Sequence, residues 1–155
     1  MIDRFKVVNR HNPELSSFNN KSPLSVGNGE FAFTADITGL QTFPEYYEDE
    51  MPLCTMAQWG WHSFLSGEEC RREDLELEYY HGRSRKIGYA SREDGQEGLF
   101  NYLRQNPHKF HLGQIGLNIK KSDGGKVEIA DIHTIQQRLD IWRGILISKF
   151  EIDKI

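Results

Sequence analysis

The sequence of 155 residues has few cysteines and no long apolar run, and each shortage excludes a class of protein. Its two cysteines, Cys54 and Cys70, lie sixteen positions apart without any Cys-x-x-Cys pair, so they do not form a zinc motif. Either they pair in an oxidising compartment or they stay free thiols, and the sequence leaves both open. No apolar stretch approaches about 18 residues, so we expect no membrane segment.

Nucleotide-binding and nucleophile motifs are also missing. The sequence has no phosphate loop, no dinucleotide fingerprint and no nucleophile elbow, and we expect no cofactor. A net charge of −4 argues against nucleic acid as the main partner, because phosphate binding needs a basic surface. The one basic cluster, Arg83-Ser84-Arg85-Lys86, follows an acidic stretch over Glu68–Glu78. We interpret both clusters as solvated loop faces, with binding patches as the alternative.

The N-terminus does not resemble a signal peptide, because no apolar run follows the charged residues of Met1–Phe5. The sequence leaves the location open: periplasmic or secreted if a signal peptide has been removed, and otherwise cytoplasmic. The C-terminal strand pattern reaches almost to Ile155 without a cap. We therefore expect the chain to be one part of a larger protein.

The clearest structural pattern present is period-two alternation at the C-terminus. Residues 136–153 predict a strand, a turn at Gly144 and a second strand, in which Leu146, Phe150 and Ile152 share one face with Ser148. A second hairpin is predicted over 24–39, where Gly27-Asn28-Gly29 supplies residues that tolerate a tight turn.

The rest of the chain predicts long loops between short elements. We expect a short helix over 99–105 that stops before Pro107, strands over 110–119 and 127–132, and a turn at 122–125. Residues 1–21 are predicted irregular, and 66–97 a polar loop excursion. The sum favours a single mainly β domain over 1–155, an antiparallel β-sandwich with long loops and one short helix.

Four segments together resemble a known family. They are Asn9-Arg10-His11-Asn12-Pro13, the hairpin from Leu24 to Gly39 with its Gly-Asn-Gly-Glu-Phe turn, Gln58-Trp59-Gly60-Trp61-His62, and Leu139-Asp140-Ile141-Trp142-Arg143-Gly144. They are similar to the N-terminal domain of the six-hairpin glycosidases, the clan of the maltose and kojibiose phosphorylases, the acid trehalases and related bacterial glycoside hydrolases. The resemblance covers both ends of the chain, whereas the polar middle, roughly 66–97, has no clear counterpart.

The resemblance implies a β-supersandwich, a fold like that of galactose mutarotase, that packs on a C-terminal (α/α)6 barrel of the same parent protein. In that clan the general acid lies on the barrel, so no residue of this chain is assigned a catalytic role. Glycoside cleavage needs two carboxyl groups, or one with phosphate, beside the scissile bond. The implied function is a non-catalytic domain of a glycoside hydrolase or phosphorylase that packs on the barrel and sends an aromatic loop toward an oligosaccharide substrate. The alternative is a free-standing carbohydrate-binding module.

The best candidate binding residues are Gln58, Trp59, Trp61 and His62. Sugars stack their apolar C–H faces on indole rings, and their hydroxyls pair with amide and imidazole groups. Alternatively, the tryptophans plug an interface with a barrel or fill the core of the sandwich. Only the sugar interpretation requires an exposed ring beside polar groups.

Other polar groups are weaker candidates for a site. His108 and His111 have a spacing that would suit a metal on a helix, but Pro107 argues against a helix there, so we interpret them as surface or strand-edge residues. The acidic residues between Glu45 and Glu50 are interpreted as a solvated loop rather than as an acid pair or a calcium site. We expect no metal.

Overall fold

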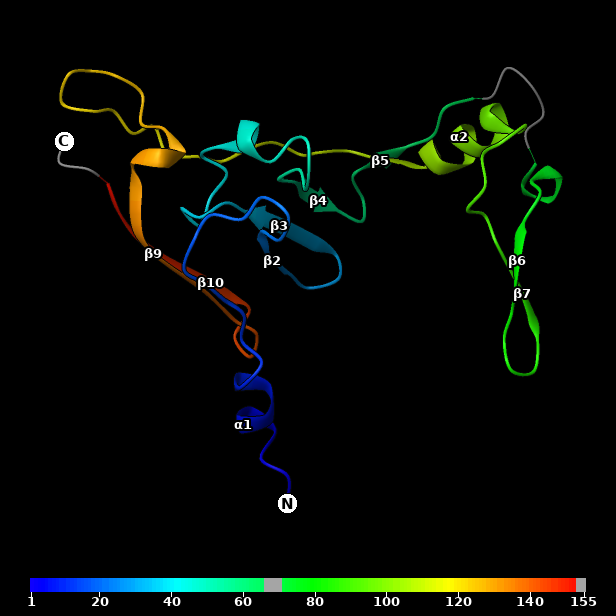
Figure 1. The fold of residues 1–155 in the computed structure, drawn as a ribbon, viewed down its shortest axis with the longest axis horizontal. Helices are drawn as coiled ribbons and strands as arrows, with labels where there is room; N and C mark the ends of the chain where they lie inside the picture. Colours follow the sequence, from blue (N-terminus) through cyan, green and yellow to red (C-terminus); the bar gives the residue numbers. More distant parts are fainter. Residues whose placement is uncertain (66–70, 153–155) are drawn as a thin grey trace. The chain divides into compact units, whose positions relative to one another are not determined.

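The computed structural model describes residues 1–65 and 71–152 (Figure 1). The chain divides into two compact units: unit 1 holds residues 1–60 and 111–155, and unit 2 holds residues 61–110. Strands account for 31% of the structure and helices for 16%, and the described strands pair antiparallel, so the prediction of a mainly β, antiparallel fold is confirmed. A single domain over 1–155 stays a prediction.

The elements follow one another along the chain with these bounds. The strands are β1 (Glu14–Leu15), β2 (Leu24–Gly27), β3 (Phe31–Ala35), β4 (Thr55–Ala57), β5 (Trp61–His62), β6 (Glu78–His81), β7 (Lys86–Tyr89), β8 (His108–Lys109), β9 (Ile132–Asp140) and β10 (Ile145–Ile152). The helices are α1 (Arg4–Asn9) and α2 (Glu97–Gln105), with the 3-10 turns η1 (Pro44–Tyr46), η2 (Arg72–Asp74) and η3 (Ile129–Asp131).

Unit 1 contains two three-stranded sheets, ordered β1-β9-β10 and β2-β3-β4. The hairpin β9–β10 is the one predicted from the C-terminal alternation, and its turn closes with a hydrogen bond from Gly144 N to Asp140 O of 2.8 Å. Leu146, Ser148, Phe150 and Ile152 are the partly buried positions of β10, as the period-two pattern predicts. The hairpin β2–β3 likewise turns at the predicted glycines.

The core of unit 1 lies where these sheets adjoin, since β2 contacts both β9 and β10. Ile37, Phe43, Val127 and Ile132 form the buried cluster, and Phe150 and Ile152 of β10 pack against it. Phe43 and Tyr47 lie in the long connection between β3 and β4, and both are buried. These two aromatics therefore pack on the domain itself.

Two predicted strands are absent from unit 1, and one helix was missed. Over 111–119 the chain makes single hydrogen bonds, such as Leu112 N to Thr55 O at 2.8 Å and Gln41 N to Ile115 O at 2.8 Å, instead of a ladder. A Cβ at Gly116 would lie 2.8 Å from the Gln41 carbonyl oxygen, so this glycine allows a backbone approach that strand spacing does not. The predicted strand over 110–119 was wrong, because the prediction rested on the alternation of apolar residues and did not consider the glycines between them.

The predicted strand over 127–132 is replaced by the turn η3 followed by the start of β9. Glu128 N donates to the Asp131 carboxylate at 2.8 Å in a capping box, which stabilises the tight turn over an extended chain. The turn at 122–125 is present, with Gly124 at positive φ. The predicted irregular segment 1–21 contains α1, whose first turn is capped by the Asp3 carboxylate accepting from Lys6 N.

Unit 2 is built from two separate two-stranded ribbons, β5–β8 and β6–β7, and the helix α2. Helix α2 is the predicted one, and it begins two residues earlier than expected. The predicted polar excursion over 66–97 contains η2 and the ribbon β6–β7, while its residues 66–70 lie outside the described part. Within the described residues of unit 2, only Leu75 and Phe100 are buried apolar side chains.

The structure bears on two further expectations from the sequence, which concern membrane segments and the two cysteines. No helix in the described ranges is long and apolar enough to span a bilayer. Cys54 is a free cysteine that is partly buried in unit 1, and Cys70 lies outside the described residues.

Candidate functional site

Gln58 and Trp59 follow the edge strand β4 of unit 1 and are held by the turn of the β2–β3 hairpin. Gln58 N donates to Glu30 O at 2.7 Å, and its side-chain amide donates to the Glu30 carboxylate at 3.2 Å. Gly60 N donates a hydrogen bond to Ala57 O at 3.1 Å, which closes a tight turn that contains Trp59. The indole of Trp59 is 71% exposed. This half of the candidate site is therefore a solvent-facing ring next to an anchored amide and a carboxylate.

Trp61 and His62 belong to β5 of unit 2, where they lie opposite Lys109 and His108 of β8. His62 stacks on Phe110 with a centroid distance of 4.7 Å and meets the edge of Phe64 at 4.4 Å and of His108 at 5.2 Å. We call His62, Phe64, His108 and Phe110 the four-ring cluster. Trp61 is not part of it, because neighbouring residues in a strand point to opposite faces, and its indole is 51% exposed.

The four predicted site residues thus divide evenly between the units. Gln58 and Trp59 lie together with Glu30 in unit 1, and Trp61 and His62 lie together in unit 2. Both tryptophans are exposed beside polar groups, so neither fills the core of its own unit. Sequence reasoning missed Glu30 and the four-ring cluster, although the alternation His108–Phe110 is visible in the sequence.

The other polar candidates have structural partners. The imidazole of His111 accepts a hydrogen bond from Thr55 N at 3.0 Å through Nδ1. The Lys126 ammonium lies 2.7 Å from the Glu45 carboxylate, and this hydrogen bond lowers the pKa of the Glu45 carboxyl. The Lys121 ammonium likewise lies 2.7 Å from the Asp131 carboxylate and lowers the pKa of that carboxyl. Within residues 1–65 and 71–152, no group of three or more His, Cys, Asp or Glu side chains could hold a metal ion.

Asp36 is a buried carboxylate that the sequence did not single out. It is 0% exposed and accepts hydrogen bonds from Thr38 N at 2.7 Å, from the Thr38 hydroxyl and from Phe43 N at 2.8 Å. Burial, with the Asp36 charge as a second cause, raises the pKa of the nearby Tyr47 hydroxyl well above its ordinary value. Asp36 thereby organises the turn that carries Phe43 into the core, and the pattern Asp-x-Thr-Gly was the available signal.

Gln137 of β9 joins this network from the opposite sheet. Its side-chain nitrogen donates to Asp36 O at 2.6 Å and to the Ser148 hydroxyl at 2.8 Å, and its buried amide oxygen has no partner among the described residues. The bonds that Gln137 makes join the two sheets of unit 1, so we assign it a structural role.

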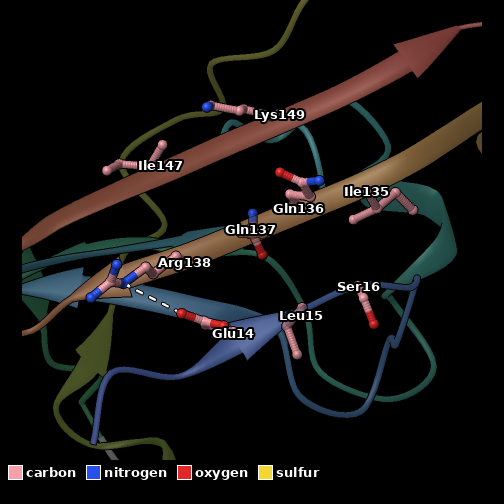
Figure 2. Close-up of a pocket in the computed structure, with 9 residues that line it drawn as sticks. All are labelled: Glu14, Leu15, Ser16, Ile135, Gln136, Gln137, Arg138, Ile147 and Lys149. Atoms are coloured by element: carbon pink, nitrogen blue, oxygen red, sulfur yellow. Dashed lines mark ion pairs between the residues drawn. The ribbon is translucent and has the colours of Figure 1, made fainter. Parts of the chain in front are cut away.

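A pocket of about 510 Å³ lies along β1, β9 and β10 in unit 1 (Figure 2). Its lining consists of Glu14, Leu15, Ser16, Ile135, Gln136, Gln137, Arg138, Ile147 and Lys149. Glu14 is the one carboxylate among these lining residues, and it pairs with Arg138 at 3.5 Å. Because a glycosidase needs two facing carboxyl groups, or one and a phosphate, this lining does not provide the hydrolytic pair.

Comparison with known proteins adds no relative: no family model, no curated protein and no solved structure matches this chain.

Proposed function

We propose that this chain is a non-catalytic β domain of a carbohydrate-active enzyme, a glycoside hydrolase or phosphorylase, and that it packs on the enzyme's (α/α)6 barrel. The observation that carries the proposal is the exposure of every tryptophan in the sequence: 71% for Trp59 and 51% each for Trp61 and Trp142. Tryptophan is highly buried on average and is enriched at binding surfaces, so three open indoles favour a binding role.

The parent enzyme provides the test of packing. If its reading frame is expressed as two pieces, this chain and the remainder, we expect the pieces to copurify and the tryptophan emission of this chain to shift to the blue as its indoles lose contact with water. A remainder without paired amphipathic helices, or pieces that stay apart, would reject the barrel as partner.

The second candidate is direct sugar binding by Gln58 and Trp59 of unit 1, and one observation favours it. The Trp59 ring is open to solvent while the Gln58 amide beside it is fixed by Glu30. A sugar that stacks on the ring therefore meets a preoriented polar group, which reduces the entropy lost on binding. As a free-standing module the chain would bind sugars without a barrel.

Titration calorimetry with a panel of neutral oligosaccharides tests this candidate on the isolated chain. We expect weak binding by at least one sugar and a loss of about tenfold in Trp59→Ala, because an aromatic contact contributes up to about 1.5 kcal/mol. Trp142→Ala is the matched control, since Trp142 is also exposed but lies in the β9–β10 turn against Phe5. A flat response to every sugar, or equal losses in both variants, would eliminate the Trp59 site.

A further inference from the structure

His62 and His108 lie opposite each other in the ribbon β5–β8 of unit 2. They are register partners, so their side chains point to the same face of the ribbon, and their ring centroids are 5.2 Å apart. Neither imidazole makes a hydrogen bond or an ion pair in the described part of the chain. Since a neutral imidazole has one nitrogen with a free lone pair, each histidine offers a ligand atom that the fold does not use.

The distance between the two rings suits a single metal ion. A zinc ion binds imidazole nitrogens at about 2.0–2.1 Å in a tetrahedral arrangement, which places each ring centroid about 3.2 Å from the ion. Two such rings at the tetrahedral angle have centroids about 5 Å apart, and the distance between His62 and His108 is 5.2 Å. The rings are inclined by 65°, so they do not stack on each other, and one ion can meet both at their edges.

Aromatic and amide contacts hold the His62 ring in place before any ligand arrives. The ring stacks on Phe110 at 4.7 Å and meets the edge of Phe64 at 4.4 Å. Phe64 N in turn donates to the Asn106 side-chain oxygen at 2.7 Å, and the Tyr102 hydroxyl donates to Phe64 O at 3.2 Å. A ligand atom that is fixed beforehand loses less entropy when it binds an ion.

The donor atoms select the class of ion. Imidazole nitrogen suits Zn²⁺, Cu²⁺ and Ni²⁺, whereas Mg²⁺ and Ca²⁺ take oxygen ligands. The four-ring cluster consists of two imidazoles and two phenyl rings and contains no carboxylate. Trp61 and Lys109 pair with each other and belong to the opposite face of the ribbon, so the Lys109 charge is directed away from the two histidines. The His62 face therefore fits a transition-metal ion better than a hard cation.

The ribbon β5–β8 has little else to hold it together. Its strands are two residues long, and a lone ribbon is marginally stable in water. Leu75 and Phe100 are the buried apolar side chains among the described residues of unit 2. Small units with so little core commonly rely on a metal ion or on disulfides. An ion held by one ligand from each strand would join β5 to β8, because metal binding is coupled to the folding of its ligands.

We propose that His62 and His108 bind one divalent transition-metal ion, of the class of Zn²⁺, Cu²⁺ and Ni²⁺, and that the ion pins β5 to β8. Water completes the coordination, so the ion is exchangeable. The ribbon thus gives His108 a partner, His62, that its spacing from His111 in the sequence did not indicate. Whether the chain binds sugar at Trp59 does not affect this site, because Trp59 belongs to unit 1.

Titration calorimetry of the whole chain, freed of metal by EDTA and dialysis, tests the site with four chlorides: zinc, copper(II), nickel and magnesium. We expect saturable zinc binding, tighter binding of copper in line with the general order of metal affinities, and none of magnesium. His62→Phe and His108→Phe should each weaken zinc binding at least tenfold, because they keep an aromatic ring but remove the nitrogens. His81→Phe, which changes a histidine of the other ribbon, is the matched control and should bind zinc as before.

Two measurements on the unaltered chain do not depend on how the variants fold. Nickel, which is paramagnetic, should broaden the imidazole NMR signals of His62 and His108 at lower concentration than those of His11 and His81. Saturating zinc should slow amide exchange at least tenfold in β5 and β8, relative to the metal-free chain, and leave β6 and β7 unchanged.

Several results would overturn the site. Zinc binding that persists in both phenylalanine variants would mean that other donors, such as the cysteine thiols, hold the ion. Magnesium binding equal to that of zinc, or no zinc binding at all, would show that the two imidazoles only pack. Amide exchange in β5 and β8 that zinc leaves unchanged would reject the link between the strands.

Discussion

Unit 1 buries Ile37, Phe43, Val127 and Ile132 between two adjoining sheets, whereas unit 2 buries only Leu75 and Phe100 among its described residues. In the same part of unit 2, eight large apolar or aromatic side chains stay exposed, from Trp61 to Phe110. Burial of apolar area is the dominant favourable term in folding. The comparison teaches that unit 1 has a core of its own, while the described part of unit 2 has local contacts and many exposed apolar side chains.

The largest expected effect comes from removing the central aromatic of unit 1. Phe43→Ala should lower the free energy of unfolding by about 3–5 kcal/mol, because it deletes a fully buried ring and leaves a cavity. Phe100→Ala in unit 2 is the matched variant. Urea unfolding followed by circular dichroism should show a much smaller shift for Phe100→Ala, and equal shifts would contradict the difference between the units.

The buried carboxylate of unit 1 comes next. Asp36→Ala should cost about 2–4 kcal/mol, because the backbone N–H groups of Thr38 and Phe43 would lose their acceptor in a buried turn. Asp36→Asn should cost less, since it keeps one acceptor oxygen. Thermal unfolding measures both, with the exposed Asp49→Ala as the control; the account fails if Asp36→Ala is as mild as the control.

A smaller and local effect is expected in the four-ring cluster of unit 2. Phe110→Ala removes the ring on which His62 stacks, and an aromatic pair contributes about 0.5–1.5 kcal/mol beyond its buried area. Amide exchange should accelerate in β5 and β8 and stay unchanged in β9 and β10. Tyr89→Ala, on the other ribbon, is the control, and equal acceleration at β5 in both variants would show that the cluster is not a separate unit of stability.

The smallest effect is the pH dependence of two ion pairs in unit 1, Lys126–Glu45 and Lys121–Asp131. Hydrogen bonds from Lys126 and Lys121 lower the pKa values of the Glu45 and Asp131 carboxyl groups in the folded state. The two ion pairs therefore stabilise the fold fully at pH values above the ordinary pKa values, 4.5 for Glu45 and 3.8 for Asp131. This stabilisation is lost as the pH falls through the lowered values. Solvent screening keeps it small. Unfolding curves below pH 5 should show a shallower acid loss in Glu45→Gln, and an unchanged acid slope would argue against the pair.

Much of unit 1 followed from periodicity, and the misses have physical causes. The hairpins β2–β3 and β9–β10 were predictable because alternation and turn glycines agree there. The strand expected over 110–119 failed because Gly116 lets the backbone approach Gln41 too closely for a ladder. Helix α1 was missed because Val7 and Val8 are β-branched and weaken the helical signal, while its cap at Asp3 supplies the missing stability.

The candidate site was predictable only in part. The sugar interpretation required exposed indoles at Trp59 and Trp61, and both residues are exposed, whereas the alternative of a filled core did not. The contact of Gln58 with Glu30 depends on a hairpin turn 28 residues earlier in the chain. The four-ring cluster pairs β5 with β8 across more than forty residues, and such pairings leave no local signal.

Hydrogen exchange on the isolated chain, read amide by amide, tests the contrast between the units most directly. We predict that the amides of β9 and β10 exchange only through global unfolding, whereas those of β5–β8 and β6–β7 exchange within about tenfold of the rate of an unfolded peptide. Equal protection in both units would mean that unit 2 has a core of its own and would contradict the account.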